Sequence, residues 1–299
     1  MPGFLSTRVA ALVAFCAVVV GVAAGNAGGK STSAVIAFAS NRDGDSEIYV
    51  MNPDGSGVRR LTHSPKYDSP TSWSRDGRKL LFYTQRTAGG DVWVMNADGS
   101  GQRDLTRDPA HDSGGSWSPD AKQIVFDSNR GGAGDIYLMR ADGSGTRKLT
   151  DDPANDGSAA WSPGGKTIAF VSDRNGTPEI FAMNVDGSSQ TALTQGVSDS
   201  APAWSPDGRR LAFVRVVSGK AAIYVMNAGG SGQRQVIRDR GGFIGGLSWS
   251  PDSRRIAFSS GRDSPAGELY VVGADGSGLK RLTSNRFGDN SPVWSPATR

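Results

Sequence analysis

Cysteine, histidine and excess charge of one sign are scarce in this chain of 299 residues, and each scarcity excludes a class of function. The single cysteine, Cys16, lies in an apolar N-terminal run, so the rest of the chain offers neither a disulfide nor a thiol nucleophile. Two histidines, His63 and His111, are too few for a histidine-rich metal centre. The formal net charge is only +4 with both signs interspersed, so we expect no nucleic-acid partner.

Long apolar runs are also lacking. The run at residues 9–24 has 16 residues, whereas a membrane-spanning helix needs about 20. One basic residue precedes this run and small residues follow it, which is typical of a secretory signal peptide. We therefore predict a signal peptide over residues 1–27, ending at residue 24 or 27, and an extracytoplasmic protein that is periplasmic or secreted. Once the peptide is removed we expect no stable membrane span; retention of the run as an N-terminal anchor is the alternative.

Amphipathic helical periodicity is absent as well, and a strand-turn-strand pattern takes its place. The pattern is Trp-Ser-Pro-Asp-Gly followed by an apolar triplet, and a second turn, mostly Asp-Gly-Ser-Gly, and a Leu-Thr pair complete each unit. Its tryptophans recur every 43 to 45 residues, at Trp73, Trp117, Trp161, Trp204, Trp249 and Trp294. This period and four short strands per unit are typical of a β-propeller blade, in which we expect the tryptophans to pack between blades.

The two ends of the chain each carry half of a repeat. The apolar triplet that begins at Ile36 has no Trp strand before it, and Trp294 has no triplet after it. A C-terminal inner strand would complete the first blade and leave no inner strand edge unpaired. We therefore predict an all-β fold over residues 28–299, a six-bladed β-propeller of four-stranded antiparallel blades, with the ring closed by the C-terminal strand.

The repeat resembles that of a known family. Trp-Ser-Pro-Asp-Gly-x-x-Ile-Ala-Phe, followed by Ser-x-Arg-x-Gly and Glu-Ile-Tyr-Val-Met-Asn, is similar to the WD-like repeat of TolB-type β-propellers from Ser33 to the C-terminus. This repeat also occurs in propeller domains attached to prolyl-oligopeptidase-like hydrolases. The resemblance implies a propeller fold and extracytoplasmic binding. TolB carries an α/β domain ahead of its propeller, whereas 35 residues precede the repeats here, so we expect the propeller alone.

Catalytic motifs are not evident. The chain has no Gly-x-Ser-x-Gly nucleophile elbow, and its Asp-rich turn at residues 41–45 lacks the spacing of a calcium loop. We expect a non-catalytic monomer without a cofactor that binds a protein or peptide in the cell envelope or outside the cell. Two alternatives stay open: an enzyme that uses the central channel, such as a carbohydrate lyase or lactonase-type hydrolase, and a structural domain of an envelope assembly.

Two charged series repeat with the blades. Five residues before each tryptophan lie Asp68, Asp112, Asp156, Asp199 and Asp289, with Ile244 at the sixth position. Four residues after each triplet phenylalanine lie Arg42, Arg86, Arg130, Arg174 and Arg262, with Val217 at the sixth. Both series fall at one end of the strands, so we expect a ring of structural ion pairs; an acidic ring that binds a cation or basic peptide is the alternative.

The exceptions predict how this ring pairs. If each arginine faces the aspartate of the following repeat, Arg174 pairs with Asp199, and Val217 with Ile244 as an apolar substitute for an ion pair. Phe243 and Ile244 also form either a specialised apolar contact or part of a degenerate blade. We expect the partner to approach the face bearing Asp68, Asp112, Asp156, Asp199, Asp289, Phe243 and Ile244, since the opposite face consists of near-identical turns.

Overall fold

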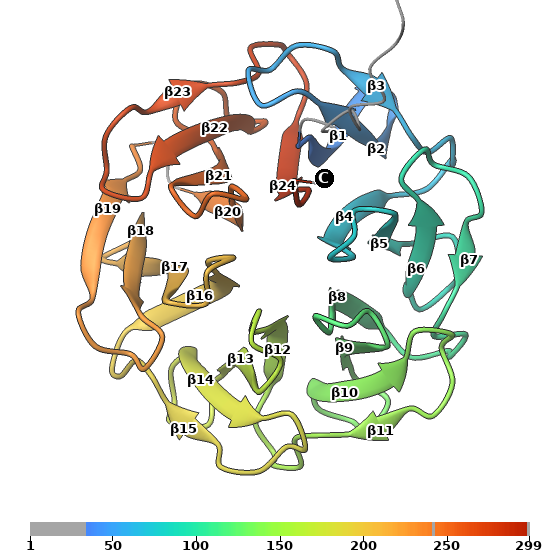
Figure 1. Ribbon diagram of the computed structural model, residues 1–299, viewed down its shortest axis with the longest axis vertical. Helices are drawn as coiled ribbons and strands as arrows, with labels where there is room; N and C mark the ends of the chain where they lie inside the picture. Colours follow the sequence, from blue (N-terminus) through green and yellow to red (C-terminus); the bar gives the residue numbers. More distant parts are fainter. Residues whose placement is uncertain (1–33, 241–242, 298–299) are drawn as a thin grey trace, which may run out of the picture. The chain divides into compact units, whose positions relative to one another are not determined.

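The computed structural model describes residues 34–240 and 243–297, which form a closed ring of six four-stranded sheets (Figure 1). The predicted fold class is therefore confirmed. The expected signal peptide at residues 1–27, with Cys16, lies outside the described residues. Among the residues that are described, no helix is long and apolar enough to cross a membrane.

Each blade is one antiparallel sheet whose strands run in order from the channel to the rim. Blade one consists of β24 (Asp289–Trp294), β1 (Ile36–Asp43), β2 (Asp45–Met51) and β3 (Arg59–Arg60). Blade two consists of β4 (Asp68–Trp73), β5 (Lys79–Thr84), β6 (Asp91–Asn96) and β7 (Arg103–Asp104). Blade three consists of β8 (Asp112–Trp117), β9 (Gln123–Ser128), β10 (Asp135–Arg140) and β11 (Arg147–Lys148).

The other three blades follow the same order. Blade four consists of β12 (Asp156–Trp161), β13 (Thr167–Ser172), β14 (Glu179–Asn184) and β15 (Thr191–Ala192). Blade five consists of β16 (Ser198–Trp204), β17 (Arg210–Val217), β18 (Lys220–Asn227) and β19 (Arg234–Arg238). Blade six consists of β20 (Ile244–Trp249), β21 (Arg255–Ser260), β22 (Glu268–Gly273) and β23 (Lys280–Arg281). At five residues, β19 is longer than the two-residue outermost strand of every other blade.

The C-terminal strand closes the ring as predicted. β24 pairs antiparallel with β1, with Ile36 opposite Trp294 and Ser40 opposite Asp289 (red beside blue in Figure 1). The first blade thus takes its inner strand from the other end of the chain, and its second strand has a partner on both sides.

The two faces of the ring differ in how their connections are built. We call the end where inner strands finish at tryptophan the turn face, and the end where they begin the loop face. On the turn face the Ser74 hydroxyl donates to Asp76 at 2.6 Å, and Gly77 has the positive φ of +69° that this tight turn requires. Gly99, in the outer turn of blade two, has φ +93°, and a Cβ there would lie 2.5 Å from the Leu61 carbonyl oxygen of blade one.

The core lies between blades, and the tryptophans belong to it. Trp73 of blade two packs with Ile48 and Val50 of blade one, and Trp117 of blade three packs with Val94 of blade two. Five of the six repeated tryptophans are at most 9 % exposed, and Trp204 is half-buried. Packing between blades, rather than a stacking platform for ligands, is therefore their role.

Candidate functional site

In blades one to five, an ion pair at the loop face joins the inner strand to its neighbouring strand. The N–O distances are 3.0 Å for Arg42–Asp289, 2.5 Å for Arg86–Asp68, 2.7 Å for Arg130–Asp112 and 3.0 Å for Arg174–Asp156. These aspartates are at most 3 % exposed. Each arginine also lies over the aromatic ring of the third strand, as Arg174 does over Phe181 at 4.7 Å. The guanidinium thus contacts three strands of its blade.

The predicted pairing of Arg174 with Asp199 is wrong. Arg174 binds Asp156 of its own blade and also Asp152, at 3.0 and 2.7 Å. Asp156 begins β12 and Arg174 follows the end of β13, so antiparallel pairing brings the two together within one sheet. Asp199 lies in the next blade, where it accepts two hydrogen bonds from Arg215, both at 2.7 Å.

The expected apolar pair of Val217 and Ile244 is also wrong. Val217 stands opposite Lys220 at the exposed end of the β17–β18 hairpin, and Ile244 stands opposite Ser260 in blade six. Arg215, two residues before Val217, supplies the guanidinium in blade five. In blade six Asp239 supplies the carboxylate, 3.2 Å from Arg262 Nε. Every blade therefore has a buried Arg–Asp pair, and blades five and six draw one member from another position.

Burial changes the acidity of two of these carboxylates. Desolvation raises the pKa of Asp68 and of Asp112 above the ordinary aspartate value, although Arg86 and Arg130 oppose the shift. Because the aspartates are covered, the loop face does not present them to solvent as an acidic ring. Their geometric effect is to fix the start of each inner strand at the channel mouth.

The sequence analysis missed a second set of buried acids, at the beginning of the third strands. They are Glu47, Asp91, Asp135, Glu179 and Glu268, at most 3 % exposed. The threonine of the Leu-Thr pair serves this site: Thr106 donates to Asp91 at 2.8 Å and accepts from the Val92 N–H at 3.2 Å. An acid recurring before each Ile-Tyr-Val run was the signal in the sequence. Blade five has Ala222 and Ile237 there instead, and Ile237 pairs with Ile223 through the backbone of the longer β19.

The loop face carries most of the exposed apolar side chains. Of the six large ones among the described residues, four lie there: Tyr67, Val216, Val217 and Phe243, between 37 and 48 % exposed. The other two, Val58 and Leu279, follow outer turns of the turn face. Tyr67, Tyr83 and His111 form a row of tilted rings, with centroids 6.0 and 5.5 Å apart. The loop face is thus the more apolar and aromatic of the two.

A hollow of about 610 Å³ opens on the same face, beside Tyr67. Asn41, Asp45, Lys66 and Asn290 line it, so it brings together side chains from blades one and two. Phe243, immediately before β20, lies close to Gly267 of blade six. A Cβ added to Gly267 would lie 3.1 Å from the Phe243 ring and 2.6 Å from the Asn290 side chain. Asn290 thus lines the hollow and also lies near Gly267, as Phe243 does.

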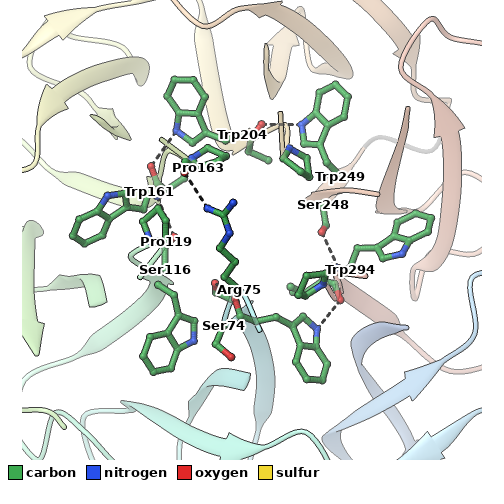
Figure 2. Close-up of a pocket in the computed structure, with 18 of the residues that line it drawn as sticks. Ser74, Arg75, Ser116, Pro119, Trp161, Pro163, Trp204, Ser248, Trp249 and Trp294 are labelled. Atoms are coloured by element: carbon green, nitrogen blue, oxygen red, sulfur yellow. Dashed lines mark hydrogen bonds between the residues drawn. The ribbon is translucent and has the colours of Figure 1, made fainter. Parts of the chain in front are cut away.

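The channel itself opens on the turn face into a cavity of about 570 Å³ (Figure 2). Its wall repeats the Trp-Ser-Pro segments of the six inner strands and adds alanine, glycine and small aliphatic residues. Among the described residues that line it, Arg75 is the one charged residue. Within residues 34–240 and 243–297, no group of three or more His, Cys, Asp or Glu residues is placed to hold a metal ion.

The closed ring of six four-stranded blades, with an Arg–Asp pair at the loop face of each blade, makes this protein a six-bladed β-propeller. Residues 109–200 and 194–299 match the family described as the TolB beta propeller domain. Since this match covers more than half of the sequence, the chain belongs to the TolB β-propeller family.

Solved structures agree with this assignment. TolB from Acinetobacter baumannii is 21 % identical with a TM-score of 0.79, over 89 % of this chain and 67 % of that chain. A putative TolB from Agrobacterium tumefaciens is 22 % identical with a TM-score of 0.68, over 87 % and 92 %. The oligogalacturonate lyase of Vibrio parahaemolyticus is 15 % identical with a TM-score of 0.58, over 84 % and 74 %. At these identities the likeness shows the fold alone. No curated protein matches the sequence.

Proposed function

We propose that this protein is an exported, non-catalytic TolB-type propeller that binds a protein or peptide through its loop face, in the cell envelope or outside the cell. One observation carries the proposal: four of the six large exposed apolar side chains among the described residues lie on that face, which also has a hollow lined by Tyr67. Aromatic anchors beside polar groups are typical of protein-binding surfaces. The buried Arg–Asp pairs hold the loop ends beneath this surface in place.

The surface residues and the buried residues take different parts in this proposal. Phe243, Ile244 and Tyr67 contact the partner, with Lys66 and Asn290 as polar neighbours. The buried aspartates Asp68, Asp112, Asp156, Asp199 and Asp289 support the face from below. A rigid frame under variable loops is how many scaffolds present binding residues.

Export rests on the N-terminal sequence and on the family. A basic residue, an apolar run and small residues at residues 1–27 fit a signal peptide, and the family is named for TolB. Absence of catalysis rests on the channel lining, because general acid–base chemistry needs paired titratable groups and the described part of the wall offers a single guanidinium. The lyase and hydrolase alternatives would need such a pair elsewhere.

Matched charge insertions on the two faces test the proposal. We expect Tyr67→Glu with Phe243→Glu to reduce capture of the partner from the organism's own envelope extract at least tenfold, as measured by quantitative mass spectrometry. Val58→Glu with Leu279→Glu is the control, since these side chains are equally exposed on the turn face. Thermal unfolding checks that all variants are folded. If the turn-face pair abolishes capture and the loop-face pair does not, the partner binds the other side of the ring.

A further inference from the structure

The turn at the end of β4 differs from its five counterparts at one position. Five repeats place proline after Trp-Ser, at Pro119, Pro163, Pro206, Pro251 and Pro296, whereas blade two has Arg75. The flanking residues keep the ordinary turn, in which Ser74 donates to Asp76 and the Gly77 N–H donates to the Ser74 carbonyl at 2.8 Å. The turn therefore does not need the arginine for its own geometry.

The Arg75 side chain extends over the mouth of the channel rather than away from the ring. Figure 2 shows it in the middle of the cavity, with its guanidinium directed at Pro163 of blade four. The distance from Nη1 to the Pro163 carbonyl oxygen is 3.5 Å, which is the outer limit of a hydrogen bond. This contact uses one of five N–H donors, and Arg75 has no ion-pair partner within the part of the chain that the structure describes.

Among the described residues, the rest of the cavity wall carries no charge: it consists of serine, threonine, proline, glycine, alanine, leucine, valine and tryptophan residues. The neighbouring Asp76 is not part of the wall, and it accepts hydrogen bonds from the Ser74 hydroxyl and the Arg78 N–H, at 2.6 and 3.0 Å. A cation without an ion-pair partner at the mouth of a cavity whose described lining carries no other charge attracts anions, because the walls focus its field toward the opening. Other arginines of comparable reach, such as Arg210 and Arg255, lie over Trp249 and Trp294 instead.

We propose that this cavity is a binding site for a carboxylate on a compact apolar body, with Arg75 as the residue that recognises it. A guanidinium matches the two oxygens of a carboxylate through parallel hydrogen bonds, which are stronger than its single long bond to a neutral carbonyl. The Pro163 contact gives way when the anion arrives. Proline rings and alanine side chains contact the apolar body.

The cavity limits the ligand in charge and size. One guanidinium neutralises one negative charge, so a dianion would carry its second charge into a neutral wall at a desolvation cost. A volume of about 570 Å³ falls within the usual range for small-molecule sites, about 300 to 1,000 Å³. The site lies on the turn face, so it is separate from the loop-face surface of the proposed function and can fail or succeed independently.

Titration of the folded protein with benzoate, followed by NMR of the arginine Nε–H and tryptophan indole resonances, tests this site. We expect benzoate to shift the Arg75 resonance and to bind at least tenfold more tightly than benzamide, its neutral isostere. Arg75→Pro copies the other five blades and is therefore expected to fold. It should reduce benzoate affinity to the benzamide level, and Arg75→Lys should fall between.

The control is Arg78→Ala, which removes a second arginine of the same turn, with a side chain 84 % exposed. Its benzoate affinity should equal that of the parent. The proposal is overturned if the parent shows no benzoate shift, if benzamide binds equally well, or if Arg75→Pro retains the affinity. Inorganic phosphate is the competing probe, and tighter binding of phosphate than of benzoate would overturn the carboxylate assignment.

Discussion

Blade five and blade four fasten the start of the inner strand with the same kind of ion pair but take the arginine from different places. Arg174 follows the end of β13, whereas Arg215 lies within β17, two residues earlier in the repeat. Because side chains alternate along a strand, a step of two keeps the guanidinium on the same side of the sheet. It lies over Tyr224 at 4.9 Å, as Arg174 lies over Phe181 at 4.7 Å. The buried aspartate requires a cation, and either position supplies it.

The outer half of blade five differs in a second way. In blades with two-residue outer strands a threonine side chain accepts the third strand's N–H, as Thr106 does from Val92. In blade five the backbone of β19 continues and pairs Ile237 with Ile223. A longer strand and a threonine with an acid are thus two ways to satisfy the same backbone group. Blade five thus lacks the threonine and the acid of the other blades but satisfies the same backbone group with its longer outer strand.

The largest expected effect comes from removing the buried aspartate in either blade. Asp199→Ala in blade five leaves the largely buried Arg215 without a carboxylate, and Asp156→Ala in blade four leaves Arg174 with only the more exposed Asp152. We expect each to lower the free energy of unfolding by about 3 kcal/mol. Urea denaturation of the two variants measures it. A cost below about 1 kcal/mol in blade five alone would show that the Arg215 pair is not equivalent to the Arg174 pair.

A rescue variant sharpens the same comparison. Arg215→Ser should destabilise the protein in the same way, since it leaves Asp199 charged and unpaired. Adding Val217→Arg moves the arginine to the position used in the other blades, and we expect recovery of about half of the loss. No recovery would mean that the longer β17–β18 hairpin prevents the arginine from reaching Asp199 from position 217.

A smaller effect separates the outer strands. Thr106→Val in blade two keeps the side-chain shape but leaves the Val92 N–H and Asp91 short of a partner. We expect a loss of about 2 kcal/mol in the free energy of unfolding. Ile237→Val in blade five removes one methylene and should cost about 1 kcal/mol or less. Urea titrations compare the two, and equal costs would show that the threonine hydroxyl contributes nothing beyond packing.

The smallest expected effect is a pH dependence that arises where blade three meets blade four. Asp127 of blade three accepts hydrogen bonds from the Ser158 and Ala159 N–H groups of blade four, at 2.8 and 3.2 Å. The equivalent position of blade four is occupied by Val171. Burial raises its pKa from 3.8 to about 6 despite these bonds. The folded state therefore binds this proton more tightly than the unfolded state does. The resulting contribution of Asp127 to the free energy of unfolding is fully present below pH 3.8 and is lost as the pH rises through about 6.

Replacement of this carboxyl removes the effect. We expect the unfolding free energy of Asp127→Asn to fall less between about pH 5.2 and pH 7 than that of the parent, by about 1 kcal/mol. The amide oxygen can still accept from the neighbouring blade. Chemical denaturation at both pH values measures the difference, and parallel pH profiles for the two proteins would contradict the prediction.

The repeat made the fold predictable from the sequence. It did not make the long-range ion pairs predictable. Trp-Ser-Pro-Asp-Gly and Asp-Gly-Ser-Gly are local signals, because the residues that make each turn are adjacent in the chain. The pairing of Arg174 depends on which strand lies beside which. Residues 18 apart within one sheet meet, while Asp199 at a separation of 25 belongs to the next blade. Val217 and Ile244, in neighbouring repeats, looked like one apolar pair that replaces an ion pair. Instead, Arg215 supplies the guanidinium in place of Val217, and Asp239 supplies the carboxylate in place of Ile244.

By itself the sequence determined the number of blades, the order of strands and the closure by the C-terminal strand, because period, alternation and turn residues act over a few positions. Only the tertiary structure decided the contacts made across sheets and across the channel. It placed the aspartates under the surface instead of on it, and it directed Arg75 over the channel mouth toward Pro163, two blades away. Such contacts depend on how side chains reach between strands in space, and no spacing along the chain records that reach.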